Sequence, residues 1–166
     1  MKKLLFTALL FVVSIVASVG ASAQLPSVTV KDTKGKPVNV ASLNNDGKPF
    51  IISFFATWCK PCIRELRAIA DLYPDWADET GVKMYVVSID DAQNTSKVKP
   101  FVDAEGWEYE VLLDANSDFF RAMGLSAVPH VLVVDGDGNI AYNHSGYTDG
   151  SETELINIVR KLNSKK

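Results

Sequence analysis

Residues 50–62 read FIISFFATWCKPC. The first seven form an apolar run interrupted by Ser53 alone, which is typical of a strand buried on both faces of a sheet. From about Cys59 to Tyr73 the apolar side chains recur at helical spacing, so we predict a helix directly after that strand. We interpret Pro74 as the residue that stops this helix. A strand that runs into a helix, with both cysteines of the chain at the junction, places the candidate chemistry at that junction.

The segments on either side of this stretch alternate between strand and helix patterns. We predict further strands at 28–31, 82–89, 108–113, 131–134 and 140–143, and helices at 97–105, 118–123 and from Ser151 onward. The turn Asp135–Asn139 joins the last two strands as a hairpin, and Ser151 with Glu154 has the spacing of a capping box. This order predicts an α/β fold, with a central mixed β-sheet flanked by helices and a right-handed first crossover.

Length and charge narrow the class of protein. The chain has 166 residues, 17 Lys and Arg against 20 Asp and Glu, and a formal net charge of −3. A chain of this length predicts one domain. The acidic balance disfavours a nucleic-acid partner, because such partners are bound through basic faces. Two cysteines are too few for a disulfide-dense scaffold.

The first 23 residues have the three-part pattern of a secretory signal peptide. Met1-Lys2-Lys3 is a basic start, residues 4–19 are almost continuously apolar, and Ala21-Ser22-Ala23 has the small residues of a cleavage site. We therefore divide the chain into a signal peptide at 1–23 and one domain at 24–166, and expect a periplasmic or otherwise exported protein. The alternative is a retained leader that anchors the domain to the membrane, although a spanning helix needs about 20 apolar residues.

The Cys-x-x-Cys motif at residues 59–62 is a candidate redox site. Two cysteines three residues apart in a first helical turn can bring their sulfurs within disulfide distance. The positive end of the helix and the neighbouring Lys60 favour the thiolate of Cys59. Pro61 fits the first turn, where its missing N–H costs nothing. Cys62 lies one turn deeper, so we expect it to be the more buried, resolving thiol.

Three other interpretations of the cysteine pair are weaker. A purely structural disulfide would join residues too close in sequence to constrain the unfolded chain. Half of a zinc site would have only His130 and His144 to complete it, whereas structural zinc takes four ligands. Two inert buried thiols would not stand at an electropositive turn between a strand and a helix. We predict a redox pair and no metal site.

Residues 54–62 resemble the active-site segment of thioredoxin-like proteins, and most closely that of exported bacterial thiol:disulfide oxidoreductases of the TlpA/ResA type. The resemblance covers roughly residues 25–163 and implies the thioredoxin-like fold. Ala127-Val128-Pro129-His130 matches the segment in which the family carries a cis-proline facing the disulfide. It implies that Pro129 is that cis residue and that the backbone of Val128 pairs with a substrate peptide. An ordinary trans proline is the alternative.

The same resemblance implies an extra helix and strand around 93–113, which serves either partner selection or packing at the sheet edge. It also implies that Ser53 stands where thioredoxins carry a buried Asp, and that Glu65 matches an active-site Glu. Glu65, three residues past Cys62, would tune the thiols and relay protons; the alternative is a Glu on the helix surface. We expect Trp58 to pack over the disulfide, and His130 to be a bystander.

The resemblance implies an exported oxidoreductase that reduces protein or peptide disulfides, is supplied with electrons by a membrane thiol donor, and serves cytochrome c maturation as one destination. It implies no cofactor besides the redox-active Cys59–Cys62 disulfide. Two alternatives stay open. The fold could act as a disulfide oxidase or isomerase, or as a non-enzymatic copper or metal carrier, although such carriers use a wider cysteine spacing. We also interpret Asp90-Asp91 as a solvated loop.

Overall fold

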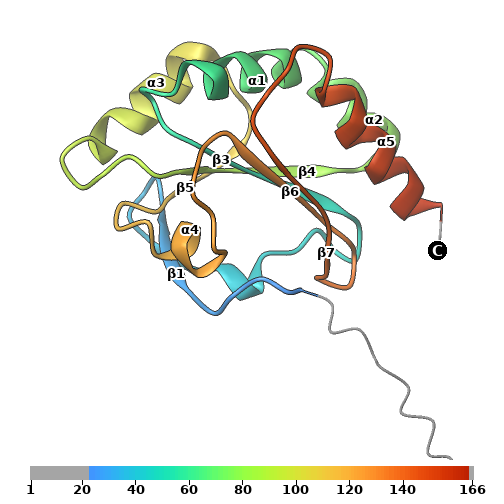
Figure 1. Ribbon diagram of the computed structural model, residues 1–166, viewed down its shortest axis with the longest axis horizontal. Helices are drawn as coiled ribbons and strands as arrows, with labels where there is room; N and C mark the ends of the chain where they lie inside the picture. Colours follow the sequence, from blue (N-terminus) through green and yellow to red (C-terminus); the bar gives the residue numbers. More distant parts are fainter. Residues whose placement is uncertain (1–22, 165–166) are drawn as a thin grey trace, which may run out of the picture.

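The computed structural model describes residues 23–164 (Figure 1). The predicted signal peptide lies outside this range except for Ala23, so it stays a prediction. In the described part of the chain, no helix has both the length and the apolar character needed to cross a membrane.

A seven-stranded mixed sheet forms the centre of the domain, in the order β2-β1-β5-β4-β3-β6-β7. The strands are β1 (Thr29–Asp32), β2 (Pro37–Asn39), β3 (Phe50–Phe55), β4 (Lys83–Ser88), β5 (Glu110–Leu113), β6 (His130–Val134) and β7 (Ile140–Ser145). Strands β3, β4 and β5 are mutually parallel, and the other pairings are antiparallel. The predicted α/β class and mixed sheet are confirmed, and so is the hairpin between β6 and β7.

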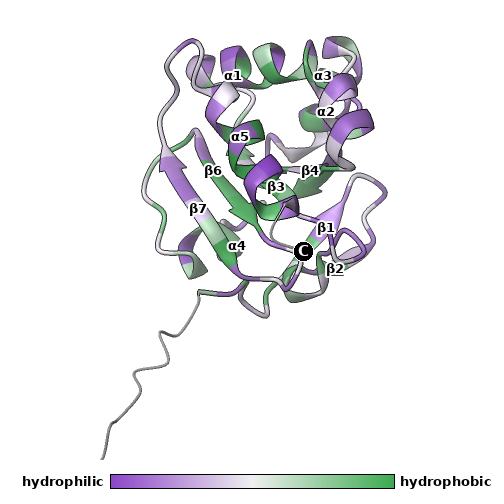
Figure 2. Ribbon diagram, turned by 90° about the vertical axis from the view of Figure 1, so that its right-hand side faces the viewer, coloured by the Kyte–Doolittle hydropathy of each residue, from purple (hydrophilic) through white to green (hydrophobic). Residues whose placement is uncertain are grey.

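Helices cover both faces of this sheet. They are α1 (Lys60–Ala70), α2 (Tyr73–Thr80), α3 (Val98–Glu105), α4 (Asp118–Ala122) and α5 (Glu152–Asn163), with short 3-10 helices η1 (Val40–Ser42) and η2 (Thr95–Lys97). Figure 1 shows α1, α2, α3 and α5 on one face and α4 on the other. Figure 2 shows the apolar residues concentrated in the central strands, with polar residues on the outer sides of the helices.

Strand β3 lies between the two cores, and all six of its residues are buried. Ile51 and Phe55 face the core beneath α1, whereas Phe54 faces the opposite core. There Phe54 packs against Phe119 of α4, with ring centroids 4.8 Å apart. Full burial on both faces explains the unbroken apolar run in the sequence. It also makes β3 a rigid base for the residues at its carboxyl end.

The segment after α1 differs from the prediction. A single helix through Tyr73 was expected, with Pro74 as its stop, but α1 ends at Ala70 and a second helix begins at Tyr73. Pro74 lies in the first turn of α2, where a residue without an N–H is tolerated, so it starts a helix here.

One strand was missed, and one further local prediction was wrong. The missed strand is β2, which pairs antiparallel with β1. The capping box at the start of α5 is absent, because the Ser151 side chain makes no cap hydrogen bond. Glu154 instead accepts a hydrogen bond from the Tyr142 hydroxyl at 3.0 Å.

The predicted extra helix and strand around 93–113 are present as α3 and β5. Strand β5 lies inside the sheet between β4 and β1, so this segment does not pack at a sheet edge. After α3, the Trp107 ring packs edge-on against Phe55 of β3, with centroids 6.1 Å apart. The buried Tyr109 hydroxyl donates a hydrogen bond to the Leu66 carbonyl of α1 at 2.8 Å. The segment therefore contacts both β3, which leads to the Cys-x-x-Cys motif, and α1, which begins within it.

Candidate active site

The two cysteines form a disulfide at the point where β3 leads into α1. Their Cα atoms are 5.3 Å apart. Cys59 is the N-cap residue of α1, and its sulfur accepts a hydrogen bond from the Cys62 backbone N–H at 3.3 Å. Cys59 is 5% exposed and Cys62 is 0% exposed, which confirms that Cys62 is the deeper of the two. A thiolate on Cys59 would meet the positive end of the helix.

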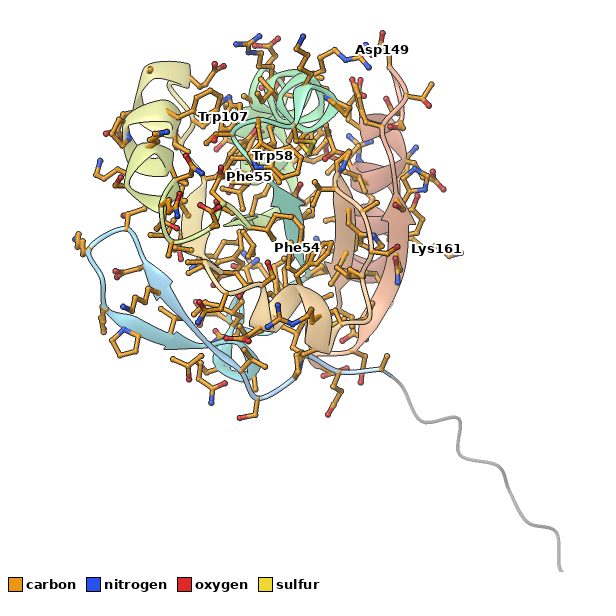
Figure 3. All side chains as sticks on the ribbon, turned by 60° about the vertical axis from the view of Figure 1, so that its left-hand side comes forward. Phe54, Phe55, Trp58, Trp107, Asp149 and Lys161 are labelled. Carbon is orange, nitrogen blue, oxygen red and sulfur yellow. A yellow bond between two sulfur atoms is a disulfide. The ribbon has the colours of Figure 1, made fainter. Side chains whose placement is uncertain are left out.

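The residues beside Cys59 face the solvent. Trp58 is 66% exposed, so it is not part of the core, and Lys60 and Pro61 are exposed in the first turn of α1. Figure 3 shows Trp58 near the end of β3, with Phe55 toward Trp107 and Phe54 on the opposite face of the strand. The reactive end of the sheet therefore presents an aromatic ring and a cation next to a nearly buried sulfur.

Glu65 lies one turn beyond Cys62 and is buried, with 3% of its surface exposed. The alternative of a surface Glu is therefore wrong. The Ser53 hydroxyl of β3 donates a hydrogen bond to the Glu65 carboxylate at 3.2 Å. Burial raises the pKa of Glu65 to about 8; the Ser53 hydrogen bond opposes this shift, and the negative charge of Glu152 adds to it. At neutral pH, Glu65 is therefore mostly protonated in the oxidised protein.

The connection from β7 to α5 brings Glu152 to this region. Glu152 accepts hydrogen bonds from the Gly150 N–H at 3.0 Å and from the Tyr147 hydroxyl at 3.3 Å. The Arg64 guanidinium of α1 lies 6.0 Å from the centre of the Tyr147 ring. The loop after β7 thus contacts the outer side of α1 near Glu65.

The Val128–Pro129 peptide bond is cis, as predicted. In the register between β6 and β3, His130 stands opposite Phe54, so Pro129 and Val128 lie beside the carboxyl end of β3. The cis peptide and the Cys-x-x-Cys motif are therefore at the same end of the sheet. Val128 is partly buried against both cores.

The two histidines have partners other than the cysteines. His130 is buried, and its Nε2 lies 2.6 Å from the Asn143 Oδ1 on β7. Burial holds the pKa of His130 below its usual value, which favours the neutral ring. The His144 ring stacks on the Tyr142 ring at 6.1 Å.

Asp90 was missed by the sequence analysis. It was expected in a solvated loop, but it is 1% exposed, so that expectation was wrong. Its carboxylate accepts hydrogen bonds from the Thr57 backbone N–H at 2.9 Å and from the Thr57 hydroxyl at 2.6 Å. The available signal was its position directly after a buried parallel strand next to β3, because the carboxyl ends of such strands meet at one edge of the sheet.

Comparison with known proteins agrees with this geometry. Residues 21–143 match the AhpC/TSA family. The chain is 30% identical over 139 residues to the thiol-disulfide oxidoreductase ResA of Bacillus anthracis, covering 84% of this chain and 76% of that protein. ResA of Bacillus subtilis is 24% identical over 144 residues, covering 86% and 78% of the two chains.

Solved structures show the same fold. A thioredoxin-like protein from Porphyromonas gingivalis is 60% identical, with a TM-score of 0.77 and coverage of 87% of this chain and 94% of that one. StoA from Bacillus subtilis is 22% identical, with a TM-score of 0.62 and coverage of 80% and 99%. The chain accordingly belongs to the AhpC/TSA family and is, within it, a thioredoxin-like thiol-disulfide oxidoreductase of the ResA type.

Proposed function

We propose that this protein is an exported reductase of protein disulfides, in which Cys59 attacks and Cys62 resolves. The observation that carries the proposal is the cysteine pair at the N-terminus of α1 with the buried Glu65 carboxyl one turn away. The pair supplies two electrons, and the carboxyl supplies a place for a proton inside the protein.

In the first step the Cys59 thiolate attacks one sulfur of a substrate disulfide. A mixed disulfide forms with Cys59, and the other substrate sulfur leaves as a thiolate that takes up a proton. Cys59 suits this role because it is the less buried thiol and receives the Cys62 N–H at its sulfur. The helix N-terminus favours the negative charge on that sulfur.

In the second step the ionised form of Glu65 accepts the proton of Cys62, and the Cys62 thiolate attacks the Cys59 sulfur. The second substrate thiolate leaves, takes up a proton, and the Cys59–Cys62 disulfide remains. Because the Cys62 side chain is fully buried, its proton acceptor must also lie inside the protein. Because the pKa of Glu65 is about 8, a minority of the protein carries the ionised, proton-accepting form at neutral pH, and this share grows as pH rises.

Substrate would bind across the end of the sheet that carries the disulfide. The exposed Trp58 ring offers apolar contact area, and Lys60 offers a cation next to the attacking sulfur. The register of β6 supports Val128 as the backbone partner of an extended peptide and Pro129 as a residue that shapes the site. Recognition of this kind depends on the backbone of the substrate and tolerates many sequences.

The leader pattern at residues 1–23 supports export to the periplasm, either free or tethered through a retained leader. In such a compartment the oxidised pair must be reduced again, so we propose a membrane thiol donor as the electron source. We also propose cytochrome c maturation as one destination, in which haem-attachment thiols are kept reduced; this follows from the family resemblance of residues 54–62. No cofactor besides the cysteine pair is needed for these steps.

The test is the reduction potential of the Cys59–Cys62 pair, measured in thiol buffers by Trp58 fluorescence and combined with a disulfide-reduction assay on insulin. A potential below about −230 mV with insulin reduction supports the reductase. A potential above about −180 mV would assign the protein to disulfide oxidation or isomerisation, and the cytochrome c proposal would fail with it. A Cys59→Ser variant is the control and should lack insulin reduction.

A further inference from the structure

The connection that places Cys59 at the start of α1 is short and has few anchors of its own. Strand β3 ends at Phe55 and Cys59 is the N-cap residue of α1, so three residues, 56–58, join them. The third of these, Trp58, is largely exposed and does not fix the backbone by burial. Within the connection, the Cys59 N–H donates to the Ala56 carbonyl at 3.0 Å. What holds the middle residue, Thr57, therefore affects where Cys59 stands.

Thr57 is held by Asp90, which follows the neighbouring strand β4. Asp90 comes two residues after β4, and the register of β4 on β3 places Ser88 opposite Phe55. The Thr57 backbone N–H donates to Asp90 Oδ2 at 2.9 Å, and its hydroxyl donates to Oδ1 at 2.6 Å. Both oxygens of one buried carboxylate thus bind the backbone and the side chain of a single residue in the connection.

The donors around Asp90 suit a carboxylate, because its two oxygens accept all of them. A third donor, the Ser88 hydroxyl, reaches Oδ2 at 2.8 Å. An amide in place of the carboxylate would have one accepting oxygen; with that oxygen toward the Thr57 N–H and the Ser88 hydroxyl, its NH₂ group would face the Thr57 hydroxyl, which would have to turn from donor to acceptor. All three bonds would also lose the contribution of the carboxylate charge. A buried charge is retained only where hydrogen bonds replace its hydration, and these three bonds do so.

Asp90 also joins the connection to the inserted segment. Its backbone carbonyl accepts a hydrogen bond from the Thr95 hydroxyl at 3.0 Å, and Thr95 begins η2, which leads into α3. The carboxylate contacts Thr57, and the backbone of the same residue contacts the start of the insertion. The insertion and the active-site turn are therefore fixed to each other through one residue.

We propose that Asp90 is a positioning residue for the redox pair: through its two bonds to Thr57, it holds the connection in the geometry in which Cys59 caps α1. The inference rests on the proposed attack by Cys59. Asp90 acts through Thr57 and has no part in the transfer of electrons or protons. Its effect reaches the chemistry through the hydrogen bond from the Cys62 N–H to the Cys59 sulfur, which requires the capping geometry.

Weakening the hydrogen bonds between Asp90 and Thr57 should make the Cys59 thiolate less stable. We expect the rate of Cys59 alkylation at pH 7 to fall about two- to fivefold in D90N, which is the size of one interaction with a helix N-terminus. The midpoint of the alkylation rate against pH should move upward with it. A role in fold stability alone would lower the melting temperature and leave this midpoint in place.

The experiment measures the pH profile of iodoacetamide labelling at Cys59 in the reduced protein, resolved from Cys62 by peptide mass spectrometry. Three variants are compared with wild type: D90N, T57V, which removes one of the two bonds to Thr57, and S88A as the matched control. S88A removes a bond to the same carboxylate from the β4 side, so it should lower the melting temperature without moving the Cys59 profile. T57V should shift the profile in the direction of D90N, by less.

A D90N profile identical to those of wild type and S88A would overturn the proposal. If D90N cannot be purified, T57V decides: a profile shifted upward supports the proposal and an unchanged one overturns it. The proposed function has a separate readout, since failure of the wild-type protein to reduce insulin would reject the reductase and leave the labelling profiles unaffected.

Discussion

Replacing Glu65 by Gln should change how the stability of the oxidised protein depends on pH. Glu65 is buried and its pKa is raised from 4.5 to about 8, so the folded protein holds a proton that the unfolded chain releases. Folding is then linked to proton binding across this interval, and the unfolding free energy falls as pH rises through it. Gln has nearly the same shape and can accept the Ser53 hydrogen bond, but it does not titrate.

The size of the effect follows from the two pKa values. Each pH unit between 4.5 and about 8 lowers the unfolding free energy of the wild-type protein by about 1.4 kcal/mol through this group. Over the whole interval, the sum is on the order of 5 kcal/mol. Below pH 4.5 the contribution of protonated Glu65 is complete, and above pH 8 it is lost. The E65Q protein should therefore gain stability relative to wild type as pH rises.

The assay is urea unfolding of the oxidised proteins at several pH values from 5 to 8. Groups that titrate in both proteins contribute equally to the two unfolding free energies. Their contributions therefore cancel when the value for wild type is subtracted from that for E65Q. Glu108→Gln is the matched control, because Glu108 is exposed and the chemical change is the same. Its stability difference from wild type measures the effect of the same chemical change at an exposed position. Parallel curves for E65Q and wild type would refute the assignment of Glu65 as a protonated buried acid at neutral pH.

Three other changes test separate contacts. Ser53→Ala should raise the pKa of Glu65 further, because the lost hydrogen bond favours the carboxylate; the midpoint of the pH-dependent stability should move up, and a downward move would contradict the contact. Cys62→Ser should trap mixed disulfides with substrate, visible on non-reducing gels, whereas a trapped adduct in Cys59→Ser would reverse the assigned roles. Tyr109→Phe should lower the unfolding free energy by about 1 kcal/mol in urea titrations, because its buried hydroxyl bonds the Leu66 carbonyl. Tyr147→Phe, at a partly exposed bond, is the control for that loss, and an equal effect would argue against the burial reasoning.

The sequence alone predicted the structure correctly where a local pattern is compatible with only one structure. The apolar run of β3 and the spacing of Cys59 and Cys62 required no knowledge of distant residues. It predicted the wrong structure where the same residues are compatible with two structures. Pro74 fits both the end of one helix and the first turn of the next, and the second use applies here. Ser151 and Glu154 have the spacing of a capping box, but Tyr142 on β7 binds the Glu154 carboxylate.

The candidate site was predicted in part for the same reason. Glu65 was predicted from the resemblance to ResA-like proteins, and the structure places it one turn past Cys62 on the buried face of α1. Its partner Ser53 and the contact between Thr57 and Asp90 join different elements of the fold. Such contacts produce no periodic pattern in the sequence, because they depend on the register of β3 against its neighbours.

The four-residue ring closed by the Cys59–Cys62 disulfide has a thermodynamic consequence for the whole chain. So small a ring removes little entropy from the unfolded chain, so the disulfide adds little to the stability of the fold. The pair can therefore open and close while the protein stays folded. The protein can be folded or unfolded and oxidised or reduced, and these states are the corners of a thermodynamic cycle. Any difference between the potential of the folded pair and that of the same cysteines in the unfolded chain must reappear as a difference in folding free energy between the two redox forms. For a two-electron couple, a difference of about 30 mV in reduction potential corresponds to a difference of about 1.4 kcal/mol in folding free energy.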